Sequence, residues 1–398
     1  MRAMHSPRLI LKPGREKSLL RGHPWIFSGA IARLDATPPR GGSLRVVADG
    51  GRFMGWAAYS PDSQIAARVW SFEEATPLDA ALVRMRVSHA VARRARQCPD
   101  LDALRLLHAE ADGLPGVICD RYGEQLVLQL TSAGAVAWRE VLVESLLETT
   151  GLSRIYERSD AEVMALEGLA PHQGALVGAT PDGPIPFMEG GLRYSANVTA
   201  GQKTGFFLDQ RANRRQVRTL AQDADVLDCF CYSGGFTLNA LAGGARSVMA
   251  IDSSEEAISL AQQHVAHNGL ATDRVEFVVD DVFKRLRRLR DQARQFDLIV
   301  LDPPKFAPTA ALAERAARGY KDINLLALKL LKPGGRLLTF SCSGGISREF
   351  FQKILAGAAA DARLPIQIVA ALGGGLDHPV MLAFPEGDYL KGLMLERV

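Results

Sequence analysis

The chain has 398 residues, which exceeds the usual size of a single hydrophobic core, so two or three domains are expected. Hydrophobic residues make up 47% and charged residues 23% of the sequence, and these values exclude a disordered or fibrous protein. The formal net charge is only +3, but the first 75 residues carry eleven Lys or Arg against six acids. This basic region is compatible with a nucleic-acid partner and equally with an ordinary solvated surface.

Cysteine usage points to a reducing compartment, and the N-terminal residues bear on membrane association. The five cysteines are an odd set without the spacing of a disulfide framework. Cys229 and Cys231 form one pair, but the sequence has no second Cys or His pair at zinc spacing, so no metal site is expected. Residues 1–20 alternate basic and apolar side chains, and no stretch is long enough to span a bilayer. We therefore expect a cytoplasmic protein without membrane association.

Residues 1–75 are predicted to form a small β-barrel domain. Short apolar runs at 9–11, 44–47, 53–58 and 65–70 are separated by glycine, proline and aspartate turns.

Residues 76–186 show a different periodicity, which predicts a compact middle α+β domain. The elements expected there are helices over 78–97 and 138–148 and strands at 117–119, 126–130 and 154–157. A turn at 181–184 marks the end of this domain.

Residues 187–398 are predicted to form a third domain, in which apolar strands alternate with amphipathic helices. Strands are expected at 225–228, 247–251, 275–279, 298–301, 336–340 and 366–372, with a terminal hairpin near 380–395. This alternation predicts a mostly parallel, seven-stranded sheet with helices on both faces. The expected fold class is therefore multidomain α/β, with a Rossmann-like C-terminal domain.

The first strand of this domain ends at Asp228 and leads into a turn that contains Tyr232, Gly234 and Gly235. Glycine allows the backbone to approach a ligand closely. A dinucleotide site would need three glycines spaced G-x-G-x-x-G to bring a pyrophosphate onto the helix N-terminus, and this turn has only two adjacent glycines. Because S-adenosylmethionine carries no phosphate, the turn favours that cofactor.

Acids also follow the next two strands. Asp252 is placed to accept hydrogen bonds from both ribose hydroxyls, and Asp281 to accept one from the adenine amino group. Each could instead be a turn residue or helix cap, but three acids at three successive strand ends favour a cofactor site. Ser253 and Glu256 match a capping box for a helix over 255–267.

Cys342 lies at the end of a later strand, about forty residues after Asp302-Pro303-Pro304-Lys305. A pyrimidine carbon is too poor a nucleophile to take a methyl group until a thiolate has added to the neighbouring ring carbon. Free cysteine is usually a small buried hydrophobe. However, ligands of open α/β sheets gather just outside such strand ends, so Cys342 is a candidate nucleophile of a nucleic-acid methyltransferase.

These motifs resemble those of bacterial S-adenosylmethionine-dependent 23S ribosomal RNA cytosine carbon-5 methyltransferases with an N-terminal PUA domain. The resemblance covers nearly the whole chain and is carried by residues 24–27, 112–116, 120–123, 202–211, 302–306, 319–324, 337–344 and 385–392. It implies a PUA RNA-binding module, a middle α+β domain and a Rossmann-like methyltransferase domain whose last strands form an antiparallel hairpin. It also implies 23S ribosomal RNA as the partner and suggests a homodimer.

The resemblance further implies roles for individual residues. Cys342 would be the nucleophile, while the Asp302 carboxylate would face the cofactor and the target cytosine. Lys305 is a candidate phosphate or base contact, or else a solvated loop residue, and Phe306 is a candidate stacking or core residue. Lys203 and Arg211 are candidate contacts to the cofactor carboxylate or the RNA backbone.

Two other functions stay open on sequence alone. An Asp-Pro-Pro loop at residues 302–304 also serves methyl transfer to guanine or to an exocyclic amine. A non-catalytic RNA-binding protein of ribosome assembly could retain the same pocket. A thiolate mechanism serves uracil as well as cytosine, so it does not choose between the two bases.

Overall fold

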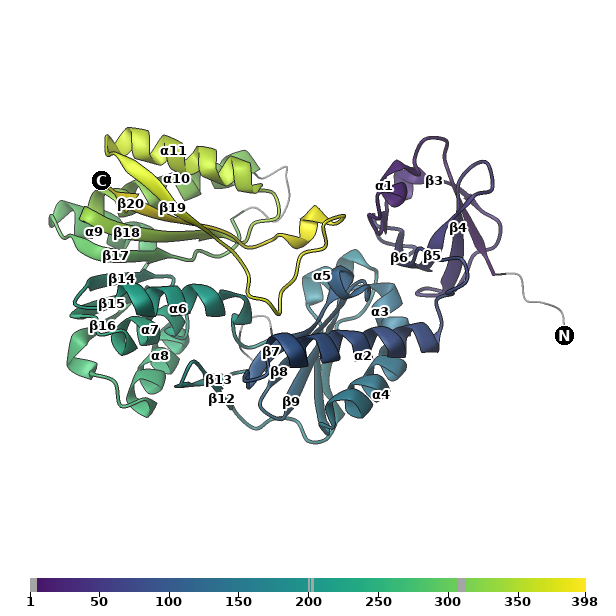
Figure 1. The fold of residues 1–398 in the computed structure, drawn as a ribbon, viewed down its shortest axis with the longest axis horizontal. Helices are drawn as coiled ribbons and strands as arrows, with labels where there is room; N and C mark the ends of the chain where they lie inside the picture. The colour runs from purple at the N-terminus through teal and green to yellow at the C-terminus, as the bar shows by residue number, and fades with distance from the viewer. Residues whose placement is uncertain (1–5, 200, 202–203, 307–312) are drawn as a thin grey trace. The chain divides into compact units, whose positions relative to one another are not determined.

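The computed structural model describes residues 6–199, 201, 204–306 and 313–398 (Figure 1). The chain forms two compact units. The first unit consists of Met1–Glu189, Ser195–Leu208 and Leu376–Gly387, and the second of Gly190–Tyr194, Asp209–Gly375 and Asp388–Val398. The first unit therefore includes both regions expected as the N-terminal and middle domains. The three-domain division at residues 75 and 186 stays a prediction.

The N-terminal part of the first unit is a six-stranded sheet with the order β2-β6-β5-β4-β1-β3. Its apolar runs pack on one another through Leu9, Leu11, Ile26, Val46 and Val69, which are all buried. The described pairing leaves β2 and β3 as edge strands, so it does not support the closed barrel that the turn pattern predicts. Its elements are β1 (Arg8–Leu11), α1 (Lys17–Leu20), β2 (Trp25–Ile26), β3 (Ile31–Leu34), β4 (Ser43–Val47), β5 (Phe53–Tyr59) and β6 (Ala67–Ser71).

The middle part of the first unit is a mixed five-stranded sheet with the order β11-β10-β9-β8-β7. Its strands are β7 (Ala103–His108), β8 (Val117–Tyr122), β9 (Gln125–Leu130), β10 (Arg154–Arg158) and β11 (Gln173–Val177). Val87 of one helix and Leu146 of another pack in the same apolar cluster as Leu107, Val117 and Leu128 of the strands. These helices are α2 (Ala80–Gln97) and α4 (Arg139–Thr150), and α3 (Ala133–Ala137) and α5 (Ala161–Leu166) complete the region.

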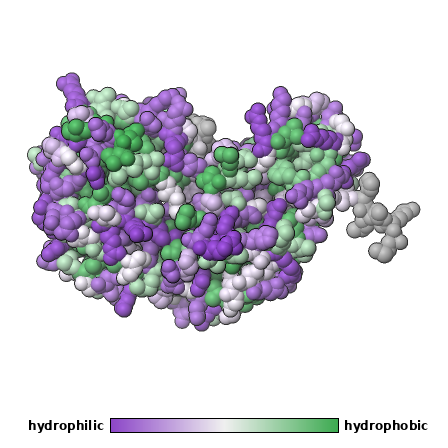
Figure 2. Space-filling model, in the orientation of Figure 1, coloured by the Kyte–Doolittle hydropathy of each residue, from purple (hydrophilic) through white to green (hydrophobic). Residues whose placement is uncertain are grey.

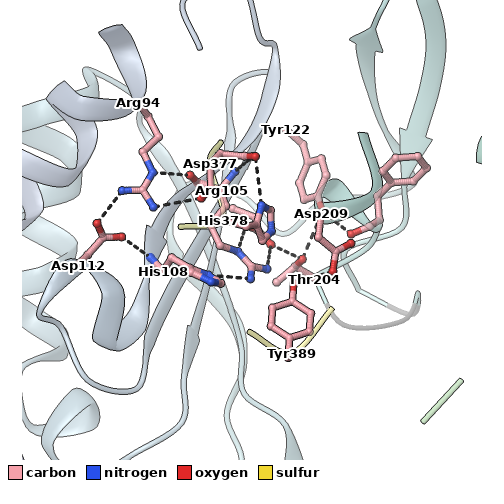
Figure 3. Close-up of polar contacts among 12 residues, drawn as sticks. Arg94, Arg105, His108, Asp112, Tyr122, Thr204, Asp209, Asp377, His378 and Tyr389 are labelled. Carbon is pink, nitrogen blue, oxygen red and sulfur yellow. Dashed lines mark hydrogen bonds and ion pairs between the residues drawn. The ribbon is translucent and has the colours of Figure 1, made fainter. Parts of the chain in front are cut away.

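A buried ionic network fixes residues 376–387 within the first unit (Figure 3). Arg94 donates hydrogen bonds to Asp112 (2.7 Å) and to the carbonyl oxygen of Asp377 (3.1 Å). The Asp377 carboxylate accepts a 3.0 Å hydrogen bond from the backbone nitrogen of Arg105. Arg105 in turn holds both carboxylate oxygens of Asp120, at 2.7 and 2.9 Å. Charges that are this deeply buried require such pairing.

The second unit is built on a seven-stranded sheet with the order β16-β15-β14-β17-β18-β20-β19. The first five strands in this order pair in parallel, whereas β20 pairs antiparallel with both β18 and β19. The strands are β14 (Asp225–Cys229), β15 (Ser247–Asp252), β16 (Val275–Val279), β17 (Phe296–Leu301), β18 (Leu331–Ser341), β19 (Ile366–Leu372) and β20 (Lys391–Arg397). The hairpin β12 (Ile185–Glu189) and β13 (Leu192–Ala196) precedes this sheet in the chain.

Helices cover both faces of this sheet, as the apolar alternation requires. Leu337 and Leu393 pack with Phe351 of one helix, whereas Phe340 on the opposite face stacks on Phe236 of another, with ring centroids 5.9 Å apart. The helices are α6 (Arg211–Leu220), α7 (Gly235–Ala242), α8 (Glu255–His267), α9 (Val282–Asp291), α10 (Ala313–Leu330) and α11 (Arg348–Ala362) (Figure 1).

The terminal hairpin predicted near residues 380–395 is wrong in its position. The antiparallel pair is formed by β19 and β20, and most of the residues between them belong to the first unit. There Phe384 packs on Trp25, with ring centroids 4.8 Å apart. Pro379 and Pro385 lack a backbone N–H, which disfavours a paired strand across this stretch.

No helix among the described residues has the length and apolar character needed to cross a membrane. On the face shown in Figure 2, hydrophilic side chains predominate and hydrophobic ones form small separate patches.

Candidate active site

The carboxyl ends of five parallel strands place the predicted site residues along one edge of the sheet. In the order of the strands, Asp281 follows β16, Asp252 ends β15, Asp228 lies in β14, Asp302 follows β17 and Cys342 follows β18. Neighbouring strands lie about 4.8 Å apart, so the edge from β15 to β18 extends over roughly 14 Å. That length accommodates an adenosine at one end and a target base at the other.

The turn after β14 has an unusual backbone. Phe230 and Tyr232 have φ angles of 62° and 47°, which few residues other than glycine adopt, and Gly234 has a φ of 77°. A Cβ atom on Gly234 would lie 2.9 Å from the Cβ of Ala261 in α8, so glycine is needed at this position. Strained turns of this kind concentrate at ligand sites.

Asp252 is held rigidly beside this turn. Its two carboxylate oxygens accept hydrogen bonds of 2.9 Å, one from the backbone nitrogen of Tyr232 and one from that of Ser254. A carboxylate has about four lone-pair positions, so acceptor capacity is left for a ribose diol. The half-buried side chains of Asp252 and Tyr232 therefore fit the predicted cofactor role.

Asp228 is fully buried below the turn. Oδ2 accepts a 2.6 Å hydrogen bond from the Thr237 hydroxyl, whereas Oδ1 has no hydrogen-bond partner among the described residues. Burial raises the pKa of this carboxyl to about 7. An unsatisfied buried acceptor is costly, and it fits S-adenosylmethionine, which brings an ammonium group and two ribose hydroxyls as donors.

Asp281 has a structural role in addition to the predicted one. Its Oδ1 caps α9 by accepting a 2.9 Å hydrogen bond from the backbone nitrogen of Lys284, and the residue is exposed. A contact to adenine stays a prediction.

The cap predicted at Ser253 is wrong by one residue, because Ser254 Oγ accepts a hydrogen bond from the backbone nitrogen of Ala257 at the start of α8.

The Asp-Pro-Pro loop and Cys342 meet at the ends of adjacent strands. Leu301 and Thr339 are paired in β17 and β18, just before the two segments. Cys342 Sγ lies 3.9 Å from the carbonyl oxygen of Pro303, at the distance of a weak S–H···O hydrogen bond. The structure thus brings the predicted nucleophile to the loop that carries Asp302.

Ser343, the residue after Cys342, fixes this arrangement to the core. Its Oγ accepts a 3.1 Å hydrogen bond from the backbone nitrogen of Phe306 and lies 2.9 Å from the Tyr320 hydroxyl. The Phe306 ring packs on Tyr320, with centroids 4.7 Å apart, so this residue has a core role in the described structure. Lys305 beside it is exposed.

Two further residues, Arg211 and Lys203, were predicted to contact the cofactor carboxylate or the RNA backbone. Arg211 begins α6 and is half-buried, and Lys203 lies outside the described residues. Their roles stay predictions. No group of His, Cys, Asp or Glu within the described residues could hold a metal ion.

Sequence reasoning missed three polar residues around the candidate nucleophile Cys342: Tyr320, Ser343 and Lys391. Lys391 Nζ donates a 2.9 Å hydrogen bond to the carbonyl oxygen of Ser343. Tyr320 and Lys391 lie in segments that carry the family resemblance, but their place beside Cys342 depends on packing and strand register that spacing does not reveal.

Comparisons with known proteins agree with this architecture. The S-adenosylmethionine-dependent methyltransferase family matches residues 176–371, and the PUA-like domain family matches residues 9–72. A Streptococcus mutans protein assigned to the SAM-dependent methyltransferases superposes with a TM-score of 0.84 at 20% identity, covering 98% of this chain and 99% of that one. A second solved structure, a complex with SAH, has a TM-score of 0.86 at 21% identity, with the same coverage. These two likenesses show the fold.

Proteins found by sequence comparison have a much higher identity to this chain than these solved structures. The ribosomal RNA large subunit methyltransferase I of Klebsiella pneumoniae is 47% identical over 388 residues, which cover 97% of both chains. The protein of the same name from Citrobacter koseri is 46% identical over 389 residues, covering 97% of this chain and 98% of its own. Because this identity extends over almost the whole length, the chain belongs to the ribosomal RNA large subunit methyltransferase I family and is an S-adenosylmethionine-dependent methyltransferase.

Proposed function

We propose that this enzyme forms 5-methylcytosine in 23S ribosomal RNA through a covalent Cys342 adduct. The observation that carries the proposal is the state of the cysteines. Four of the five are buried, and Cys342 alone is partly exposed, at the strand-end edge next to the Asp302 loop. The names of the relatives supply the class of RNA.

In the proposed mechanism, the Cys342 thiolate adds to carbon 6 of the cytosine, which makes carbon 5 nucleophilic. S-adenosylmethionine supplies the electrophilic methyl group that carbon 5 takes up. Asp302 accepts a hydrogen bond from the exocyclic amine or, in its protonated form, donates one to ring nitrogen 3 and so stabilises the negative charge that thiolate addition places on the ring. A base then removes the carbon-5 proton, the bond from sulfur to carbon 6 breaks, and the pyrimidine regains its aromatic ring.

The predicted cofactor residues lie along the same edge of the sheet as Asp302 and Cys342. Asp252 and Asp228 lie at the ends of β15 and β14, and the reacting pair lies at the ends of β17 and β18. An adenosine held at Asp252 would therefore direct the methyl group toward Asp302 and Cys342. We assign Asp252, Asp228 and Tyr232 to cofactor binding on this basis.

The test is methylation of large-subunit ribosomal RNA by the wild type and by Cys342→Ala, with the product nucleosides identified by mass spectrometry. We expect 5-methylcytidine from the wild type and a rate at least about 10³-fold lower from the variant, because the covalent route is lost. Cys98→Ala, which removes a buried thiol in the first unit, is the matched control and should keep nearly full activity.

The same assay separates the competing functions. A methylated guanine or exocyclic amine, formed as fast by Cys342→Ala as by the wild type, would replace the proposal with direct transfer at the Asp302-Pro303-Pro304 loop. A 5-methyluridine product would keep the thiolate mechanism and change the base. Cofactor binding without methylation of any ribosomal RNA would favour a non-catalytic role in ribosome assembly.

A further inference from the structure

Lys391 is a buried cation at the reacting centre. It begins β20, where it pairs with Ser341 at the end of β18. The residue is only 3% exposed, and its ammonium donates the 2.9 Å hydrogen bond to the carbonyl oxygen of Ser343. The positive charge is thereby fixed to the residue that directly follows Cys342.

The charge on Lys391 is poorly compensated where it lies. Burial lowers the pKa of Lys391, and Asp388 and Cys342 act in the opposite direction. Asp388 is itself held by Arg348, which donates hydrogen bonds of 3.1 and 3.2 Å to its two carboxylate oxygens. No carboxylate among the described residues forms a salt bridge with Lys391, and a buried ammonium with a neutral partner is costly. An anion that formed nearby would relieve this cost.

Cys342 is the group that can become this anion. In the resting arrangement its thiol is at hydrogen-bond distance from the Pro303 carbonyl, which suits the neutral form. Among the described residues, the other titratable or charged groups near Cys342 and Lys391 come from the loop after β17, from α10 and α11, and from the residues before β20: Asp302, Lys305, Tyr320, Arg348 and Asp388. Of the three cations that the described residues place in this neighbourhood, only Lys391 is buried.

We propose that Lys391 is a positioning residue for the Cys342 nucleophile: its buried ammonium stabilises the thiolate and its hydrogen bond to Ser343 orients the sulfur toward the target base. This inference rests on the function proposed above. The thiol proton passes to solvent water, Lys391 stays protonated throughout the cycle, and the sulfur returns to the thiol after elimination. The lysine touches neither substrate nor cofactor in this scheme.

The test measures how fast iodoacetamide alkylates Cys342 as a function of pH, followed by mass spectrometry of the peptide that contains it. We expect Lys391→Met to move the midpoint of the alkylation profile up by about one pH unit, which slows the reaction at neutral pH roughly tenfold. Lys391→Arg keeps the charge and should restore most of the rate. Lys353→Met, which removes an exposed lysine of α11, is the matched control and should leave the profile unchanged.

Calorimetric titration with S-adenosylmethionine shows whether each variant is folded. Equal midpoints in a folded Lys391→Met and the wild type would overturn the inference. If Lys391→Met does not fold, the alkylation midpoints of the wild type and of Lys391→Arg test the inference instead. An unperturbed thiol has a pKa of about 8.5, so a wild-type midpoint at or above about 8.5 would contradict a stabilised thiolate. Alkylation needs neither RNA nor cofactor, so this test can fail while RNA methylation through Cys342 succeeds, and the reverse also holds.

Discussion

The buried carboxyl of Asp228 is expected to couple cofactor binding to pH. Burial raises its pKa to about 7, so the folded protein holds this proton more tightly than the unfolded chain, whose carboxyl has a pKa near 3.8. The contribution of Asp228 to stability is therefore complete below about pH 4 and is lost as the pH rises through about 7. A bound cation or donor at Oδ1 would favour the ionised form and reverse this loss.

Asp228→Asn should separate the effect of the buried carboxyl on stability from its effect on cofactor affinity. The amide oxygen can still accept a hydrogen bond from Thr237, and the substitution removes the buried charge. We therefore expect the cofactor-free variant to be more stable than the wild type by about 1–3 kcal/mol at pH 8 and little different at pH 4. The affinity for S-adenosylmethionine should fall about 10- to 100-fold at pH 8. Urea unfolding and calorimetry check the two parts. A variant less stable than the wild type at pH 8 would contradict the buried-charge argument.

Single residues were predictable from sequence only where a strand end placed them. Asp228, Asp252, Asp302 and Cys342 were placed at one edge of the sheet because the carboxyl ends of parallel strands must meet there, and their roles stay predictions. Lys391 could not be found in this way. An isolated lysine in a chain is ordinarily solvated, and only the antiparallel register of β20 against β18 places this one beside Cys342.

At the scale of elements, strands with strong apolar runs were predicted closely. β16 and β19 have the predicted bounds, and β14 and β15 differ from the prediction by one residue. β18 begins at Leu331 rather than at 336, because a bulge between its pairings with Phe296 and Leu298 absorbs the Pro-Gly-Gly stretch. The 380–395 hairpin failed because Phe384 packs within the first unit, which is a long-range contact without a local signal.

The N-terminus of α8 offers a test of one corrected element. Ser254→Ala removes the hydroxyl that caps the helix, so we expect a loss of about 1 kcal/mol in the free energy of unfolding. Ser253→Ala is the matched control next to it and should change stability by less than about 0.5 kcal/mol. Chemical denaturation of both variants checks the expectation. A larger loss at Ser253 would restore the cap that the sequence pattern predicted.

At the scale of the whole molecule, the path of the chain was the least predictable feature. The chain returns to the first unit for residues 376–387 after building most of the second, and buried charges hold it there. Sequence patterns report on neighbours in the chain, whereas Arg105 and Asp377 are 272 residues apart. The two-unit division therefore came from the structure.

The buried pair of Arg105 and Asp120 is predicted to be essential for the stability of the first unit. Asp120→Ala would leave the Arg105 guanidinium buried without its carboxylate, and this should lower the free energy of unfolding by about 3–5 kcal/mol. Glu144→Ala breaks an exposed pair with Arg84 and should cost less than about 1 kcal/mol. Denaturant unfolding monitored by circular dichroism measures the free energy of unfolding of both variants. Equal losses in the two variants would refute the essential role of the Arg105–Asp120 pair.

Covalent trapping tests the central claim most directly. Carbon 5 of 5-fluorocytidine carries fluorine, which a base cannot remove as a proton, so the enzyme cannot eliminate Cys342 after methyl transfer. With S-adenosylmethionine and RNA that contains 5-fluorocytidine, we predict a denaturation-resistant complex with RNA attached at Cys342 in the wild type and none in Cys342→Ala. A complex attached at another residue, or no complex under conditions where unmodified RNA is methylated at cytosine, would contradict the account.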